Sequence, residues 1–281
     1  MSIVWFNGAF IEGTLPLDPR DRGLLLGDGI FETLLVLNKL ALWRSAHLRR
    51  METAARELGL SWQRPTLDAA LDSVLSRSSG NPEALRVTLT RGAAPRGLAA
   101  DGKNPSLLLT LAPLPAESLF QPVRLASVEI RRNPWSPSCR LKTLSYGDGV
   151  AAARAAAALG ADDALMRNTL GLAACSTIAN LFLVCGGDLI TPSLDQGVLP
   201  GITRQAFLDC APALGFTPIG RPVTMEELAG ADAVFLTNSL RLVRIVESLD
   251  GTRLRQRPLA SLIGALCEAA KQQCGTDPRL I

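Results

Sequence analysis

The sequence predicts an α+β protein of two domains, and three observations carry that prediction. The first half alternates between strand-like and helix-like patterns, the second half continues this mixture, and a proline-rich stretch separates the halves. At 281 residues, 47% of them hydrophobic, the chain can bury one large or two medium cores. We therefore expect residues 1–112 and 121–281 to form the two domains, with 113–120 as the linker.

Turn and cap residues divide the first half into elements. Asn7-Gly8, the strongest short hairpin signal, joins the first two strands. Ser45 can cap a helix that ends at Gly59. The predicted elements are strands at 3–6, 9–11, 30–37, 40–43, 85–90 and 107–111, helices at 46–58 and 66–76, and a long loop at 91–105.

The second half is predicted to open with two strands, of which the second carries Lys142. An alanine-rich segment after it is a strong helix former. The predicted elements are strands at 123–130, 163–166, 172–174, 181–184, 189–190 and 233–237, and helices at 150–159 and 202–214.

Composition and charge exclude several classes of function. The net charge is +3 and the basic residues are scattered, which argues against nucleic acid as a partner. No apolar run is long enough to span a membrane, and the start lacks the features of a signal peptide. The six cysteines show no CxxC spacing, so we expect reduced thiols in a cytoplasm. The chain has a single histidine, His47, which argues against a zinc site. A His-based catalytic triad could use only this residue as its base.

Lys142 is the candidate catalytic residue. The other three lysines, Lys39, Lys103 and Lys271, lie in turn-like or polar stretches. Lys142 lies in an alternating run, 139–144, that is typical of a strand. An amine on a half-buried strand is desolvated, which lowers its pKa and frees its lone pair to form a Schiff base. An exposed strand lysine paired with an acid would have the same pattern.

Two polar segments have the form of phosphate-binding turns. Within Leu199–Arg204, Gly201 enters a helix and leaves the N–H groups of Ile202 and Thr203 free to bind an anion. Thr237–Leu240 is a polar turn after a strand and could donate N–H groups in the same way. An ordinary capped helix and an ordinary turn remain alternatives.

A loop at 91–97 offers two arginines, Arg91 and Arg96, that would suit a carboxylate. A solvated basic loop is the alternative. Asp21-Arg22 precedes a glycine-rich turn that enters a strand, a combination common to many tight loops.

Together these segments resemble the class IV pyridoxal-phosphate enzymes (fold type IV). These comprise branched-chain aminotransferases, D-amino-acid aminotransferases and aminodeoxychorismate lyases. The resemblance implies pyridoxal 5′-phosphate (PLP) as cofactor, a small N-terminal α/β domain, a larger C-terminal mixed β-barrel-like domain, and a homodimer whose site uses both chains. The matching stretches follow the family's order: DRGLLLGDGIFET (21–33), HLRR (47–50), TRGAAPRG (90–97), RRNP (131–134), LKTLSY (141–146), STIANLFL (176–183), TPSLDQGVLPGITRQ (191–205) and TNSL (237–240).

The resemblance also implies roles for single residues. Lys142 would form the Schiff base with the cofactor and then shuttle protons, assisted by Thr33. Arg96 would clamp a substrate carboxylate, and Phe31 would line the substrate side. The cofactor-binding residues would be Arg50, Ile202, Thr203, Ser239 and Leu240 at the phosphate, and Asn180 and Cys175 at the ring.

Cys175 departs from the family pattern. The family places a glutamate five residues before the asparagine that corresponds to Asn180, where it pairs with the protonated pyridine nitrogen. A thiol is a weak hydrogen-bond partner and should not hold that proton. The cofactor should then be a poorer electron sink, unless another acid reaches the ring.

The choice of reaction follows from this departure. Formation of an aromatic ring depends less on the pyridinium than transamination does, and Phe31-Glu32-Thr33 favours the lyase branch, although Leu35 replaces an arginine common there. We therefore expect release of pyruvate from 4-amino-4-deoxychorismate to give 4-aminobenzoate. One alternative is an aminotransferase acting on branched-chain or other small amino acids. Another is a PLP-binding protein with weak catalysis. Each predicts a small substrate that carries an amino group and a carboxylate.

Overall fold

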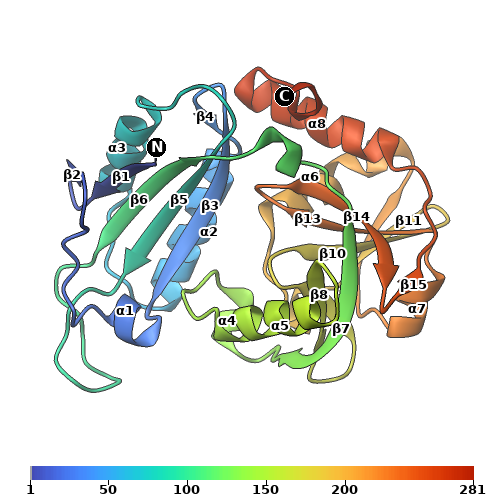
Figure 1. The fold of residues 1–281 in the computed structure, drawn as a ribbon, viewed down its shortest axis with the longest axis horizontal. Helices are drawn as coiled ribbons and strands as arrows, with labels where there is room; N and C mark the ends of the chain where they lie inside the picture. Colours follow the sequence, from blue (N-terminus) through green and yellow to red (C-terminus); the bar gives the residue numbers. More distant parts are fainter. Residues whose placement is uncertain (1) are drawn as a thin grey trace. The chain divides into compact units, whose positions relative to one another are not determined.

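The computed structural model describes residues 2–281, and the chain divides into two compact units (Figure 1). Unit 1 takes the chain through Ala116, the segment Lys142–Tyr146 and the C-terminal residues Ala270–Ile281. Unit 2 consists of Glu117–Leu141 and Gly147–Ala269. The change of unit after Ala116 lies within the expected linker, but unit 1 also includes two later segments. One of them carries the candidate catalytic lysine. The domain bounds expected from the sequence stay a prediction.

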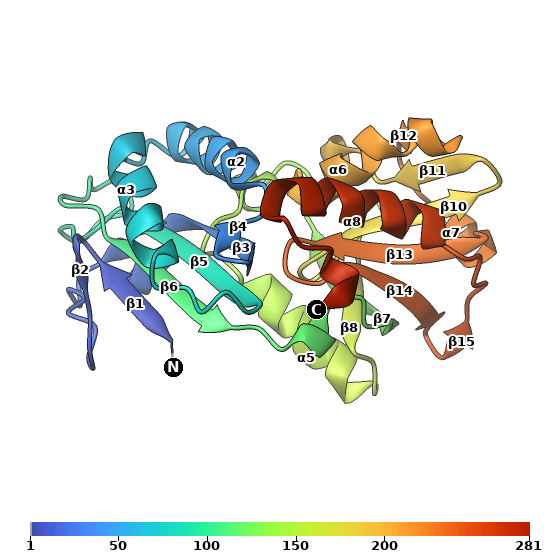
Figure 2. The ribbon, with the colours of Figure 1, turned by 90° about the horizontal axis from the view of Figure 1, so that it is seen from above.

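Unit 1 is built on a six-stranded antiparallel sheet with the strand order β2-β1-β6-β5-β3-β4. Helices α2 and α3 cover one face of this sheet (Figure 2). Their buried stripes of leucine, valine and alanine supply the apolar contact. The elements are β1 (Ile3–Phe6), β2 (Ala9–Phe10), α1 (Arg22–Leu26), β3 (Gly29–Leu37), β4 (Leu40–Ala41), α2 (Arg44–Glu57), α3 (Arg64–Leu75), β5 (Glu83–Thr90) and β6 (Leu107–Pro113), with a 3₁₀ turn at Pro278–Leu280.

Strand β3 presents different chemistry to the two faces of this sheet. Glu32 points to the face that α2 covers, because it bonds to side chains of that helix. Since side chains alternate along a strand, Phe31 and Thr33 point to the opposite face. The register places Thr88 of β5 opposite Phe31, and Arg86 opposite Thr33. The face without α2 and α3 therefore carries a cluster of polar side chains around one phenyl ring.

Unit 2 contains a closed barrel of six strands. Its order is β10-β13-β14-β7-β8-β9, and the pairing of β9 with β10 closes the ring. The pairs β7–β8 and β7–β14 are parallel and the other pairs of the ring antiparallel, so the expected mixed barrel is confirmed. Strands β11 and β12 extend the sheet from β10.

The elements of unit 2 run from green to red in Figure 1. They are β7 (Val123–Arg132), α4 (Pro137–Arg140), α5 (Gly147–Ala158), β8 (Asp163–Asn168), β9 (Ala173–Ser176), β10 (Asn180–Cys185), β11 (Asp188–Thr191), α6 (Ile202–Cys210), β12 (Thr217–Gly220), α7 (Met225–Gly230), β13 (Ala233–Asn238), β14 (Leu242–Leu249) and β15 (Thr252–Arg253), with 3₁₀ turns at Ala116–Ser118, Leu194–Gln196 and Pro212–Leu214. Helix α8 (Ala260–Cys274) begins in unit 2, and its last residues belong to unit 1.

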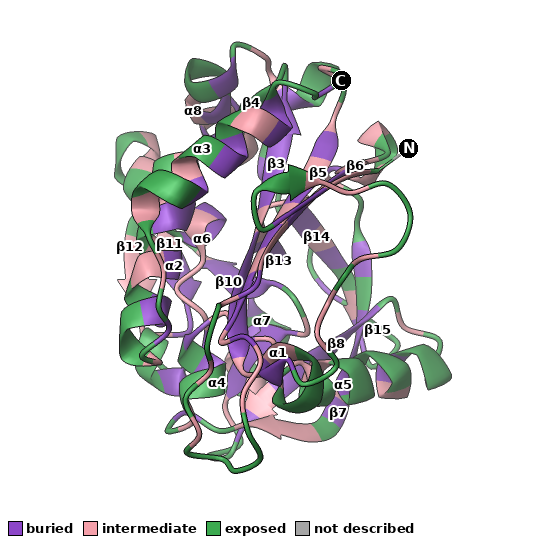
Figure 3. Cartoon of the chain, turned by 90° about the vertical axis from the view of Figure 1, so that its left-hand side faces the viewer, coloured by how far each residue is buried: buried purple, intermediate pink, exposed green. Residues whose placement is uncertain are grey.

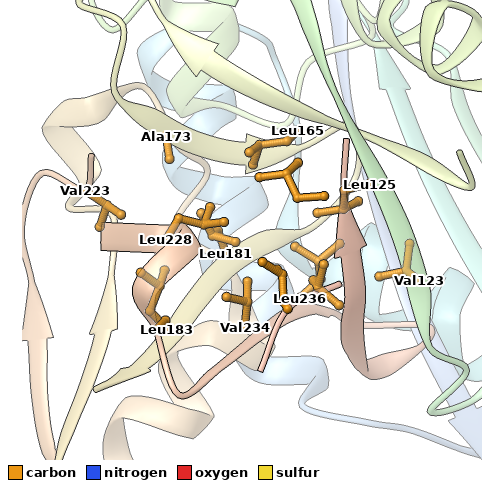
Figure 4. Packing of buried hydrophobic residues seen from close by; sticks show 14 of the residues in the cluster. Val123, Leu125, Leu165, Ala173, Leu181, Leu183, Val223, Leu228, Val234 and Leu236 are labelled. Carbon is orange, nitrogen blue, oxygen red and sulfur yellow. The ribbon is translucent and has the colours of Figure 1, made fainter. Parts of the chain in front are cut away.

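Aliphatic side chains from all six strands fill the barrel. Leu181 of β10, Leu236 of β13 and Leu165 of β8 point toward one another in its interior (Figure 4). Each fully buried side chain of this size stabilises the fold by about 1.5–3 kcal/mol relative to an exposed one. Strands β10 and β13 are buried along most of their length (Figure 3), so they offer a rigid support for whatever packs on their outer side.

An aromatic cluster fixes α6 to the outside of the barrel. Phe182 of β10 stacks on Phe235 of β13, with centroids 5.0 Å apart. Phe207 of α6 packs against both rings, at 5.8 and 5.3 Å. All three side chains are fully buried. The cluster therefore sets the direction of α6 and the place of its N-terminus.

The segment around Lys142 does not form a regular strand, so the predicted strand is wrong. Backbone bonds join Lys142 and Leu144 to β3, but only one isolated bridge, Thr143 to Ile30, is formed. The segment lies between the end of α4 at Arg140 and the start of α5 at Gly147, which leaves too few residues for a longer ladder.

Helix ends differ from the predictions for local reasons. The predicted helix 202–214 ends as α6 at Cys210, because Pro212 has no N–H to continue it. Ser45 does not cap α2, whose N-cap is Trp43 without a side-chain bond. The elements that the sequence did not predict are α1, α4, β12, α7, β14, β15 and α8.

Candidate active site

The side chain of Lys142 lies beside two aromatic rings and one hydroxyl in unit 1. Its Nζ atom is 4.3 Å from the centre of the Phe31 ring and 3.4 Å from the hydroxyl oxygen of Tyr146, the only tyrosine of the chain. The two rings meet edge to face, with centroids 5.2 Å apart. The Phe31 N–H donates to the Lys142 carbonyl at 2.9 Å. Main chain and side chain together hold the lysine against β3.

The pKa of Lys142 is lowered from 10.5 to about 8. Burial of the amine is the largest cause, and the positive charges of Arg50 and Arg86 act in the same direction, whereas the negative charge of Glu32 opposes them. A substantial fraction of this amine is therefore neutral near physiological pH. A neutral amine can attack an aldehyde and can accept a proton from carbon.

Glu32 organises the charges behind Phe31. Its carboxylate is fully buried and accepts hydrogen bonds from Arg50 Nε at 2.8 Å, from Arg50 Nη2 at 2.6 Å and from His47 Nδ1 at 2.7 Å. Burial alone would raise the pKa of Glu32, but the charge and bonds of Arg50, aided by His47, lower it to about 2. Burial lowers the pKa of His47, so the imidazole is neutral. Arg50, predicted to bind the cofactor phosphate, is thus oriented by Glu32.

Arg86 lies on the same face of the sheet as Phe31. Its guanidinium carbon is 3.7 Å from the centre of the Phe31 ring, and its Nε donates to Thr88 at 3.2 Å. Among the described residues, no carboxylate lies within ion-pair distance of Arg86, and burial lowers its pKa. A half-buried guanidinium of this kind suits a carboxylate supplied by a ligand.

Arg96 belongs to a loop that is firmly anchored rather than flexible. Arg22 donates to Asp28 at 2.7 Å and to the carbonyls of Gly97 and Leu98, each at 2.8 Å. Arg91, expected to be a second substrate-binding arginine of this loop, instead donates to Asp28 at 2.8 Å. Its terminal nitrogens bond the carbonyls of Leu58 and Gly59 at the end of α2. Arg91 is therefore a structural residue.

The exposed Arg96 lines a cavity of about 1020 Å³ in unit 1, beside α1. Lys142 and Phe31 are not among the residues that line this cavity. Other lining residues include Arg20, Arg22, Leu25, Leu26 and Leu98.

The N-terminus of α6 in unit 2 offers unpartnered donors. Gly201 is its N-cap, and no side chain caps the helix, so the N–H groups of the first turn point outward. The Thr203 hydroxyl is buried and has no partner among the described residues. A Cβ atom at Gly201 would collide with the side-chain oxygen of Asn180, whose amide nitrogen donates to Leu199 at 2.8 Å. Only glycine permits this close approach.

Strand β13, just before the turn at 239–240, contributes a second hydroxyl without a partner among the described residues, that of the buried Thr237. Helix α6 packs against β13, so both hydroxyls belong to neighbouring elements. The predicted contact through the Leu240 amide meets a competitor, because that N–H donates to Asn238 at 3.1 Å. Ser239 is half-buried in the same turn. Buried donors without acceptors fit the phosphate of PLP, which supplies several acceptor oxygens.

Cys175 lies on β9 opposite Asn180 of β10, with its thiol buried. Burial is the main cause that raises its pKa to about 11, although the charge of Arg132 acts against it. The thiol is therefore neutral at physiological pH.

Four residues near Lys142 had no functional role in the sequence interpretation: Glu32, His47, Arg86 and Tyr146. Arg86 follows the alternation of β5 and could have been recognised as the basic residue of that strand. Tyr146 could have been recognised as the only tyrosine, four residues after the lysine. Glu32 and His47 are brought together only by the packing of α2 on β3.

Within residues 2–281, no cluster of three or more His, Cys, Asp or Glu side chains could hold a metal ion. None of the helices described there is both long and apolar enough to cross a bilayer.

Similarity in sequence and fold to known proteins identifies the family. The amino-transferase class IV profile matches residues 29–249. A bifunctional aminodeoxychorismate lyase/D-amino acid transaminase from Mycobacterium tuberculosis is 28% identical over 95% of this chain and 98% of its own. The structure of 4-amino-4-deoxychorismate lyase from Pseudomonas aeruginosa is 30% identical over 94% of this chain and 98% of that one, with a TM-score of 0.82. A hypothetical aminotransferase from M. tuberculosis in a PLP-bound form is 27% identical over 97% and 99%, with a TM-score of 0.85. The chain belongs to the class IV aminotransferases and is a PLP-dependent enzyme.

Proposed function

We propose that the protein is a lyase that converts 4-amino-4-deoxychorismate to 4-aminobenzoate and pyruvate. The observation that carries this choice is the neutral, buried thiol of Cys175 at the position where the family resemblance expects a carboxylate. A reaction that ends in an aromatic ring has a driving force of its own and depends less on a protonated cofactor ring. The similarity to the P. aeruginosa lyase supports the same choice.

The residues around Lys142 suit the proton transfers of this elimination. Bound PLP would supply an aldehyde for the substrate amine and a ring that withdraws electrons. Lys142 Nζ then takes the proton from the ring carbon that carries the amine. The bond between the neighbouring carbon and the enolpyruvyl oxygen breaks, and the proton ends on the methylene carbon of pyruvate. Tyr146, 3.4 Å from Nζ, can hold the amine in position during both transfers, and Thr33 assists from the same face of β3.

The binding groups match a substrate with two carboxylates. Arg86, with no carboxylate partner among the described residues, would hold one of them beside Phe31. Because Arg96 lines a cavity that Lys142 does not line, we assign the other carboxylate to Arg96 of the second chain in a homodimer whose site uses both chains. Arg50, Ile202, Thr203 and Ser239 would bind the cofactor phosphate, with the Leu240 amide weakened in this role by its bond to Asn238. Asn180 would support the cofactor ring.

The test is to mix the purified, PLP-loaded protein with 4-amino-4-deoxychorismate. We expect 4-aminobenzoate, detected by its fluorescence, and pyruvate, detected by lactate dehydrogenase, in equal amounts. A PLP-loaded protein that releases neither product would contradict the proposal.

An aminotransferase acting on small amino acids is the second candidate, because the M. tuberculosis relative combines both activities in its name. It predicts that an amino donor converts bound PLP to pyridoxamine phosphate, visible in the absorbance spectrum. Cys175→Glu separates the candidates. A gain in transamination would indicate a weakened aminotransferase, whereas a loss of lyase turnover would show that the thiol is adapted to elimination. A protein that binds PLP and does neither would match the third, weakly catalytic alternative.

We also propose a cytoplasmic homodimer. The three leucines of α1, Leu24 to Leu26, and Leu98 on the anchored loop are exposed beside the cavity that contains Arg96. Apolar side chains grouped in this way favour contact with another protein surface. Sedimentation analysis should give a dimer, and Leu25→Glu should shift it toward the monomer. All six cysteines are free thiols, which suits a reducing compartment.

A further inference from the structure

Arg204, the third residue of α6, is a buried cation without a buried anion. Its side chain is 6% exposed. Its Nε atom donates to the Thr191 hydroxyl at 3.3 Å, and its Nη2 atom donates to the Pro192 carbonyl at 3.2 Å. Both acceptors are neutral. Among the described residues, no carboxylate forms an ion pair with Arg204.

Two other buried arginines of the chain have carboxylates close enough to act on their charge. Arg22 is as deeply buried and forms an ion pair with Asp28 at 2.7 Å. Arg244 also donates to two backbone carbonyls, and burial and the charge of Arg241 lower its pKa, but the charges of Asp163 and Asp162 act in the opposite direction. For Arg204, burial lowers the pKa and no charged group opposes it. A buried charge without a counter-charge is costly to a fold, so its presence needs a reason.

The surroundings of Arg204 indicate what that reason is. The preceding residue, Thr203, has a buried hydroxyl without a partner, as does Thr237 on the packed strand β13. Gly201 lets the backbone of the first turn approach Asn180 closely. The first turn of α6 thus combines outward N–H groups, two buried hydroxyls near by and one uncompensated guanidinium. Every one of these groups is electropositive or can donate to an anion.

We propose that Arg204 is the buried counter-charge of the cofactor phosphate, acting through space from behind the groups that touch it. The proposal rests on the assignment of the phosphate to the N-terminus of α6. It makes Arg204 a positioning residue for PLP rather than a catalytic one. In the protein without PLP, the unpaired charge of Arg204 then lowers the free energy of unfolding, and binding of the phosphate removes this cost. Cofactor affinity and stability are therefore coupled through this side chain.

Arg204→Met tests the coupling, because it removes the charge and keeps a long side chain. We expect the variant to bind PLP about tenfold more weakly, as loss of one nearby unit charge implies. Its affinity for pyridoxal, which lacks the phosphate, should stay unchanged. Both affinities follow from quenching of tryptophan fluorescence. Without PLP, its melting temperature should equal or exceed that of the parent protein, since an apolar side chain replaces an uncompensated ion.

Three variants serve as controls. Arg204→Lys keeps the charge and should keep most of the PLP affinity. Arg244→Met removes a compensated buried arginine of the same unit, so it should lower the melting temperature and leave the ratio of PLP to pyridoxal affinity unchanged. Thr203→Val should weaken PLP binding if α6 holds the phosphate.

The outcomes separate the two assignments. If Arg204→Met unfolds the protein, lowers its melting temperature without PLP, or weakens PLP and pyridoxal equally, Arg204 has an ordinary structural role and the proposal is wrong. If Thr203→Val also leaves PLP binding unchanged, the assignment of α6 itself fails. Tighter inhibition of PLP binding by inorganic phosphate in the parent protein than in Arg204→Met would support the proposal.

Discussion

The surroundings of Lys142 in unit 1 and the N-terminus of α6 in unit 2 differ in whether their buried polar groups have partners within the protein. In the network next to Lys142, the buried carboxylate of Glu32 is matched within the protein, because it accepts from both Arg50 and His47. At α6, the hydroxyl of Thr203 and the charge of Arg204 lack a matching group among the described residues. A matched network can set the proton affinity of a reacting group before any ligand arrives. An unmatched set of donors is complementary to an anion.

Reactivity and cofactor retention therefore have separate structural causes in this protein. Changes near Lys142 should alter rates, proton affinities and substrate binding, whereas changes at α6 should alter cofactor binding.

Replacing Lys142 should have the largest effect. Lys142→Arg keeps a positive charge but removes the amine that bonds to the aldehyde, so kcat should fall on the order of 10⁴-fold. PLP should still bind, with a spectrum close to that of free PLP. Lys39→Arg, in an exposed turn, is the matched control and should keep full activity. Loss of PLP binding in Lys142→Arg would show that the two regions are not separate.

Glu32→Gln should have the next largest effect, on stability. It leaves Arg50 without its buried counter-charge, which should cost about 3–5 kcal/mol of unfolding free energy. Urea unfolding measures this. Glu129→Gln removes a carboxylate whose side chain is 88% exposed although it contacts two arginines, and should change stability little. Equal effects of the two substitutions would mean that the network around Glu32 is not energetically special.

The pKa of Lys142 predicts a pH dependence. Because this pKa is about 8 instead of 10.5, labelling of Lys142 in the PLP-free protein by an amine-reactive reagent should rise with pH and be half-maximal near pH 8. Peptide mass spectrometry resolves the four lysines. In Glu32→Gln the midpoint should move to lower pH, since the carboxylate raises the pKa of Lys142. A midpoint near pH 10.5 in the parent protein would contradict the lowered pKa of Lys142.

Arg86→Gln should have the smallest effect on turnover and a clear effect on binding. Loss of a charged hydrogen bond to a substrate carboxylate should raise KM about 10- to 100-fold while kcat changes little. Arg154→Gln on the exposed side of α5 is the control. Steady-state kinetics of 4-aminobenzoate release give both constants. A fall in kcat with unchanged KM would place Arg86 in the chemistry rather than in substrate binding.

Strand alternation and turn residues are local signals, and they predicted the fold class and most of the strands. The barrel-like second domain followed instead from the resemblance to the class IV PLP enzymes, and the strand predicted around Lys142 was wrong. It could not predict that Glu32, His47 and Arg50 form one network, since their contact depends on how α2 packs against β3. It also missed α8, whose apolar residues lie in a stretch interpreted as polar. The structural role of Arg91 depends on its contact with the end of α2, which no local pattern reveals.

The single bridge between Thr143 and Ile30 has a consequence for how the enzyme acquires its activity. The two residues are separated by most of the first half of the chain, so the contact is among the slow, entropically costly ones to close during folding. The reactive amine takes its place only when a segment flanked by unit 2 has joined the sheet of unit 1. The activity therefore depends on one long-range contact of the fold as well as on the residues that touch the substrate.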